Sequence, residues 1–197
     1  FDEYNFVPVF WMASEDHDFN EINNITINGN NFTWESDQQG PVGKFKTKGI
    51  VNIIESINSI IDNSPNNTSL MNLLKRCYSQ DNLSEATRHL INELFGKFGL
   101  VILDANDVSL KQKLLPIMKE DLVFQSLSPI IKDNTFQNSK NYKTQAYVRD
   151  FNFFKITNTI RERVLEIVPE KELEDSPEKY SPNVLMRPLY QELILPN

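Results

Sequence analysis

The residues best suited to chemistry form one short cluster near the start of the 197-residue chain: Ser14, Glu15, Asp16, His17 and Asp18. A histidine between carboxylates can act as a general base or as an orienting donor, because its ordinary pKa lies close to neutral pH. The same carboxylates could instead cap the next helix, with the histidine in a structural hydrogen bond. Asp16 and Asp18 could also meet a divalent cation, but no further ligand follows at a metal-like spacing. We therefore predict no metal site.

The cluster directly follows an uninterrupted apolar run, residues 9–12 (VFWM). Apolarity that does not alternate is typical of a parallel strand covered on both faces. A second run of this kind, residues 100–103 (LVIL), ends at Asp104. Ligands of open α/β sheets bind at the carboxyl ends of the strands. The pattern predicts an α/β fold with a parallel sheet, helices and inserted β-hairpins, and with the cluster at its ligand-binding edge.

Local signals predict the elements around these strands. Asn28-Gly29 between two alternating stretches indicates one hairpin, and residues 157–159 separate the strands of another. Isoleucines at helical spacing over residues 50–61 predict a helix that Pro65 closes. Further helices are expected with caps at Thr68, Asn82 and Asp107, and a kink or restart is expected at Pro116, whereas residues 133–146 read as irregular.

A second group of candidate residues lies near the end of the chain. Asn183, Arg187 and Gln191 are four residues apart and would share one face of a helix. Pro182 and Pro188 argue against a continuous helix through this segment. Arg187 could hold carboxylates in a bidentate manner, with Asn183 as a neutral donor, or it could pair with one of the many surface acids.

Composition excludes several classes of function. The formal net charge of −7 argues against a general nucleic-acid surface and against an anionic membrane surface. The single cysteine, Cys77, excludes an internal disulfide and a cysteine-based zinc site, and its helical position predicts core packing. His89 reads as an ordinary helix residue. No apolar run approaches the roughly 18–20 residues of a membrane helix, so we predict a cytoplasmic protein without membrane contact.

Three segments together resemble one family. In order they are residues 7–23 (VPVFWMASEDHDFNEIN), 98–104 (FGLVILD) and 181–192 (SPNVLMRPLYQE), and residues 40–44 (GPVGK) fit the same pattern. They resemble the bacillithiol biosynthesis cysteine-adding enzymes, the BshC family. The resemblance implies a Rossmann-like core related to class I aminoacyl-tRNA synthetases, with connective insertions and a helical coiled-coil arm. It also implies a ligase that joins cysteine to the amino group of glucosaminyl-malate.

This resemblance gives the candidate residues their roles. His17, Asp16 and Asp18 become catalytic, and a second set is expected to bind substrate: Ser14, Glu15, Asn183, Arg187 and Gln191. The expected partners are the small molecules cysteine and glucosaminyl-malate, and a second copy of the full-length protein through the coiled-coil arm. The sequence leaves open how cysteine is activated and whether ATP or another nucleotide is used.

The resemblance also predicts how the chain is organised. Residues 1–197 read as the central part of a nucleotidyl-binding-type domain, with a helical connective region at about 47–97 and a hairpin insertion at about 133–168. The family's upstream Gly-Gln-Gln segment is not in this sequence, so we expect a fragment cut at both ends and inactive alone. Two alternatives stay open: another nucleotidyltransferase of the same fold group, and a helical interaction module without catalysis.

Overall fold

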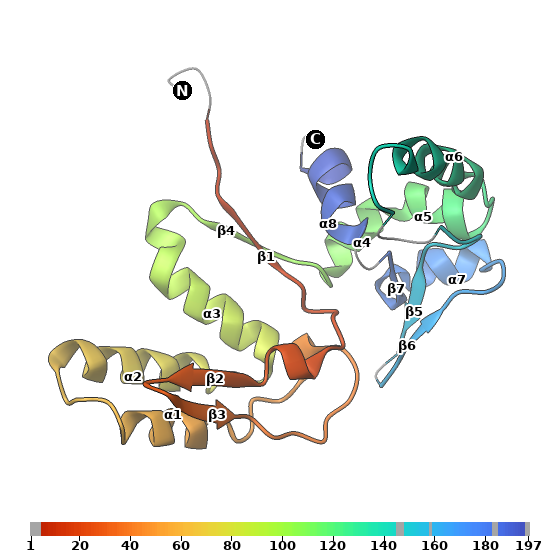
Figure 1. Cartoon of the computed structure of the whole chain (residues 1–197). Coiled ribbons are helices and arrows are strands. Elements are labelled where there is room, and N and C mark those ends of the chain that lie inside the picture. Colours follow the sequence, from red (N-terminus) through yellow and green to blue (C-terminus); the bar gives the residue numbers. More distant parts are fainter. Residues whose placement is uncertain (1–4, 145–147, 158, 183–184, 196–197) are drawn as a thin grey trace. The chain divides into compact units, whose positions relative to one another are not determined.

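The computed structural model describes residues 5–144, 148–157, 159–182 and 185–195. The chain divides into two compact units, one ending at Ala105 and the other beginning at Asn106. Within the described residues, each helix is too short or too polar to cross a bilayer. Both α-helices and β-strands occur in each unit (Figure 1), which agrees with the predicted α/β class.

The first unit contains the two predicted parallel strands, β1 (Val9–Met12) and β4 (Val101–Asp104). They pair in register, with Val9 opposite Val101 and Met12 opposite Asp104. The prediction of cover on both faces is met only in part, because Val9 and Val101 stay about two-fifths exposed. In the described chain this sheet has two strands, so few neighbouring side chains cover its amino-terminal end.

The first predicted hairpin is confirmed as β2 (Asn24–Ile27) and β3 (Asn30–Thr33). Its turn residues Asn28 and Gly29 have φ values of 50° and 78°. A two-residue turn that matches the strand twist needs left-handed backbone at both positions, and Asn and Gly adopt this conformation at the lowest cost.

Three helices complete the first unit: α1 (Ile50–Asn58), α2 (Pro65–Cys77) and α3 (Leu83–Phe95). The Asn82 side chain accepts from the Glu85 amide and caps α3 as predicted, whereas the cap expected at Thr68 is wrong. Ser64 caps α2 instead, because Pro65 is well suited to the first helical position and does not close the preceding helix there. A core cluster joins helices and hairpin: Trp34, Val42, Phe45, Ile50, Ile54, Ile57 and Met71. Short 3-10 turns connect the elements: η1 (Phe19–Glu21), η2 (Val42–Lys44) and η3 (Gly96–Phe98).

The second unit begins with three helices: α4 (Val108–Lys113), α5 (Leu115–Leu122) and α6 (Leu127–Ser139). Asp107 caps α4, and Pro116 lies in the first turn of α5, both as predicted. The irregular stretch expected from residue 133 is wrong up to Ser139, since α6 covers it. Ser128 is the buried residue of this helix, so the segment has no apolar stripe by which its sequence could reveal it.

The rest of the second unit is a small antiparallel sheet with short helices. The strands β5 (Phe154–Ile156), β6 (Arg161–Arg163) and β7 (Tyr180–Ser181) lie in the order β6–β5–β7, which confirms the second hairpin. Short helical segments accompany them, among the described residues α7 (Glu170–Asp175), η4 (Pro177–Lys179), α8 (Met186–Leu189) and the π-helical turn η6 (Tyr190–Ile194).

Candidate active site

The candidate site begins where the two parallel strands of the first unit end. Beyond the last register pair, the Ala105 amide donates to the Met12 carbonyl at 3.0 Å. The Ser14 hydroxyl donates to one carboxylate oxygen of Asp104. The predicted cluster and the acid that ends the second apolar run therefore meet at one edge of the sheet, where parallel strands present their carboxyl ends.

A tight turn shapes the loop that carries the cluster. The Asp16 amide donates to the Ala13 carbonyl at 3.0 Å. The Asp16 carboxylate accepts from the amides of His17 and Asp18, at 2.6 and 3.3 Å. An aspartate that binds the next two amides fixes its own turn. Asp16 therefore has a structural role in this turn, and this role does not conflict with its predicted catalytic role.

The His17 ring is oriented by the backbone. Its Nδ1 lies 3.0 Å from the carbonyl oxygen of Glu15. Because a carbonyl can only accept, this geometry assigns the proton to Nδ1, and the neutral ring then has its lone pair on Nε2. His17 is half-buried and Glu15 is buried. The arrangement defines Nε2 as the proton-accepting nitrogen, and this atom is itself shielded from solvent.

Residues 40–45 form a strap that is hydrogen-bonded to the loop carrying the cluster. The amides of Val42 and Gly43 donate to the carbonyls of Asp16 and Ser14, at 2.7 and 2.9 Å. A Cβ on Gly43 would lie 2.6 Å from both the Cβ and the carbonyl oxygen of Ser14. Glycine is required at this position because the two backbone segments are in direct contact.

Two residues of this site were not proposed from the sequence, Asp104 and Arg88. Arg88 of α3 has Nη2 3.8 Å from the second Asp104 oxygen, and Nη1 donates to the Ile102 carbonyl at 3.4 Å. The end of the second apolar run could have pointed to Asp104, since parallel strands share their carboxyl edge. Arg88 had no such signal, because its role depends on how α3 packs beside β4.

A sequence model described as "Bacillithiol biosynthesis BshC, N-terminal Rossmann-like domain" matches residues 1–197. The chain belongs to the BshC family. It is 42% identical to the protein named "Putative cysteine ligase BshC" of Flavobacterium johnsoniae, over 98% of the chain and 40% of that relative. Proteins of the same name from Flavobacterium psychrophilum and Christiangramia forsetii are 38% and 42% identical, each over 99% of the chain and 40% of the relative. The chain thus spans about two-fifths of the length of these relatives.

BshC membership agrees with the resemblance and with the Rossmann-like fold. The matching model describes the N-terminal domain of the family. The finer division of the chain, with a connective region at 47–97 and an insertion at 133–168, stays a prediction. The catalytic role of Asp18 also stays a prediction. The Asp18 side chain is exposed.

The predicted substrate-binding residues near the end of the chain belong to the second unit. Arg187 lies in α8 and Gln191 in η6, and both are exposed, whereas Asn183 lies outside the described residues. Of the two prolines expected to prevent a continuous helix, Pro188 does not do so, because the chain is helical on both sides of it, whereas the stretch that follows Pro182 lies outside the described residues. Pro188 falls in the first turn, where its missing N–H has no helical partner to lose. That these residues share a site with His17 stays a prediction.

Among the residues described, no carboxylate forms an ion pair with Arg187. The alternative that Arg187 pairs with a surface acid therefore has no support in this part of the chain. In the same part of the chain, no three His, Cys, Asp or Glu side chains converge as metal ligands. Cys77 is buried, and burial raises the pKa of its thiol, which fits the predicted core packing. His89 is exposed on α3.

Proposed function

We propose that this domain supplies the proton-accepting half of the active site of a cysteine ligase that joins cysteine to the amino group of glucosaminyl-malate. The family supports a role in bacillithiol biosynthesis, and the names of the relatives support a ligase. One observation carries the assignment to these residues. His17 is held by the Glu15 carbonyl at the carboxyl end of β1, with Nε2 as its basic nitrogen.

In this proposal His17 acts on the amine of glucosaminyl-malate. Nε2 takes the proton that the amine loses, so that the neutral nitrogen attacks the cysteine carboxyl carbon. The C–N amide bond forms as one carboxyl C–O bond breaks, and the oxygen leaves as water or with the group that activates the carboxyl.

The neighbouring groups hold this base in place. Asp16 fixes the turn on which His17 lies, and the Ser14–Asp104 bond joins the loop to β4. Glu15 and Ser14 are assigned to substrate contact beside the base. Asp18, at the exposed end of the loop, completes the predicted catalytic set.

The malate carboxylates are assigned to the second unit. Arg187 is exposed on α8, and a guanidinium can grip a carboxylate through two parallel hydrogen bonds. Gln191 and Asn183 would add neutral donors.

The two described histidines offer a matched test. We expect His17→Gln in the full-length protein to lower bacillithiol formation from cysteine and glucosaminyl-malate at least about 100-fold, the usual contribution of a general base. His89→Gln, an exposed change on α3, is the control and should leave the rate within twofold. Equal rates in the two variants would remove His17 from catalysis. ATP-dependent pyrophosphate release without the thiol product would support the nucleotidyltransferase alternative.

A further inference from the structure

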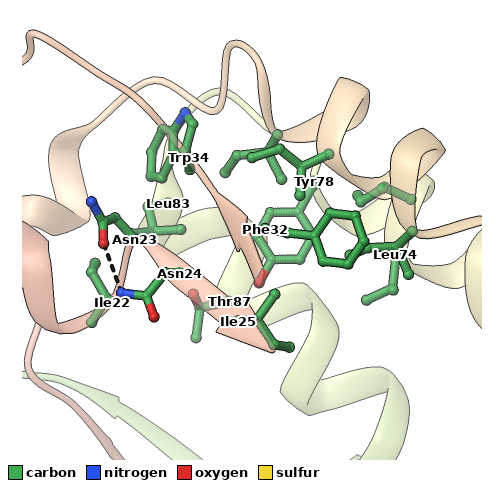
Figure 2. A pocket seen from close by; sticks show the side chains of 14 residues that line it. Ile22, Asn23, Asn24, Ile25, Phe32, Trp34, Leu74, Tyr78, Leu83 and Thr87 are labelled. Carbon is green, nitrogen blue, oxygen red and sulfur yellow. Dashed lines mark hydrogen bonds between the residues drawn. The ribbon is translucent and has the colours of Figure 1, made fainter. Parts of the chain in front are cut away.

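The first unit contains a hollow that the proposed function does not use. It lies between the hairpin β2–β3 and the helices α1, α2 and α3, and its volume is about 420 Å³ (Figure 2). We call it the hairpin pocket. Its lining includes Ile25, Phe32, Ile53, Leu74, Tyr78 and Thr87. A volume of this order lies within the roughly 300–1,000 Å³ range of small-molecule sites.

The pocket walls are fixed by packing. Trp34, which lines the pocket, is buried, and its indole N–H donates to the Lys48 carbonyl at 3.0 Å. The Phe19 ring meets the Trp34 ring edge-on, with centroids 5.1 Å apart. At the rim, Ile22 and Ile25 are about half exposed. The hollow is therefore a formed site, and a ligand would not have to open it.

The lining selects against charge. The side chains around the pocket are apolar or neutral, and its polar members are Asn23, Asn24, Tyr78 and Thr87. The Asn24 amide donates to the Asn23 side-chain oxygen at 3.0 Å, so these two groups already satisfy each other in part (Figure 2). Tyr78 and Thr87 contribute hydroxyls to the lining, and burial raises the pKa of Tyr78, which keeps its hydroxyl a neutral donor. An ionised ligand group would lose its hydration here without gaining a counter-charge.

We propose that the hairpin pocket binds a neutral, largely apolar small molecule, such as an aromatic ring or a short hydrocarbon chain, which Tyr78 and Thr87 anchor by hydrogen bonds. Burial of apolar ligand surface against the isoleucines and Phe32 supplies the affinity. The site is separate from the proposed ligase chemistry, because cysteine and glucosaminyl-malate are charged and would find no partner among these residues.

The test uses the neutral fluorescent probe N-phenyl-1-naphthylamine with the full-length protein. We expect saturable enhancement of its fluorescence, and at least tenfold weaker binding in Thr87→Phe, which fills the pocket, and in Ile25→Asp, which places a charge at its rim. Ile60→Asp is the matched control, since Ile60 is also a partly exposed isoleucine of the first unit but does not line the pocket. This control should bind the probe within twofold of the unmodified protein.

Circular dichroism and thermal unfolding show which variants fold. If Thr87→Phe does not fold, Ile25→Asp still tests the proposal, because a charge is tolerated more easily at a half-exposed position. Absence of saturable binding to the unmodified protein would overturn the proposal. Binding that Ile25→Asp leaves intact, or that Ile60→Asp weakens equally, would place the probe elsewhere and would also overturn it. Ligase activity of the same variants is measured separately and does not decide the question.

Discussion

Each unit contains a cluster of buried polar groups, and the two clusters are built differently. In the second unit Asp121 is fully buried, and its two oxygens accept from the backbone and side-chain amides of Asn152, at 2.7 and 2.9 Å. In the first unit, Ser14 and Glu15 are buried at the end of a strand, but His17 beside them is only half-buried. Asp121 ties α5 to the segment before β5, whereas the strand-end cluster orients a basic nitrogen. Burial of polar groups therefore does not by itself locate a site, and the position at the strand ends distinguishes the two clusters.

The largest effect on stability is expected from Asp121→Ala. Two donors of the half-buried Asn152 would lose their acceptor, so the free energy of unfolding should fall by about 3 kcal/mol. Denaturant unfolding measures this change, and activity per folded molecule should not change. Asp150→Ala is the control, because the Asp150–Lys132 pair is exposed and contributes little. An Asp121→Ala variant that is stable but inactive would contradict the assignment of Asp121 to structure and of the strand-end cluster to function.

Gly43→Ala should disturb the strand-end cluster through its support. The new Cβ would meet Ser14 at a distance that forces the strap or the loop to move, at a cost of about 2 kcal/mol, with a loss of activity. Gly29→Ala provides the comparison. It has a left-handed φ of 78° but open space around it, so we expect about 1 kcal/mol of strain and unchanged activity. Equal activities of the two variants would show that the strap does not position the loop.

Ser14→Ala should act on the reaction more than on the fold. Loss of the hydroxyl that joins the loop to Asp104 is expected to lower the rate of thiol formation about tenfold, or about 1.4 kcal/mol, by loosening the base. The matched variant is Ser109→Ala, since the Ser109 hydroxyl donates to Asp107 on the surface of the second unit. Steady-state rates decide the outcome. A rate for Ser14→Ala equal to that of Ser109→Ala would assign the Ser14 bond to structure alone.

The smallest effect is expected at Glu172, which joins β5, β7 and α7. Hydrogen bonds from Lys155 and from Tyr180 lower the pKa of its carboxyl below the usual 4.5. The folded protein binds this proton less tightly than the unfolded chain does, so the stabilisation is complete above pH 4.5 and is lost as the pH falls through the lowered pKa. The stability difference between the protein and Glu172→Gln should stay below about 1 kcal/mol and shrink from pH 7 to pH 3. A difference that grows at low pH would contradict this assignment.

Asp121 should show the opposite sign. Burial raises the pKa of its carboxyl, an effect that the Asn152 hydrogen bonds offset only in part. The folded protein therefore binds this proton more tightly than the unfolded chain, and the group stabilises the fold increasingly as the pH falls through the raised pKa. Unfolding of Asp121→Asn should lack this dependence. Opposite pH slopes for the two carboxylates would separate burial from hydrogen bonding as their dominant causes.

The predictions from sequence held where the signal is local. The Asn28-Gly29 turn, the caps at Asn82 and Asp107 and the two apolar runs each depend on residues within a few positions, and each is confirmed. Predictions failed where a proline can act in two ways. Pro65 and Pro188 both lie in the first turn of a helix, where proline is tolerated, and the sequence alone did not separate this from a break.

The candidate site was predictable only in its continuous part. Ser14, Glu15, Asp16 and His17 are neighbours in the chain, so their clustering needed no fold. The contact of Asp104 with Ser14 joins positions 90 residues apart and requires the pairing of β1 with β4. Arg88 adds a second condition, the packing of α3 beside β4. Long-range contacts of this kind depend on geometry that no local pattern encodes.

Trp34 has an optical consequence, because it lies in the wall of the hairpin pocket while Trp11 lies in β1. Its indole is shielded from water and held by a single carbonyl, so its emission should respond to what occupies the adjacent space. In a Trp11→Phe background, this intrinsic chromophore would report filling of the pocket without any added label.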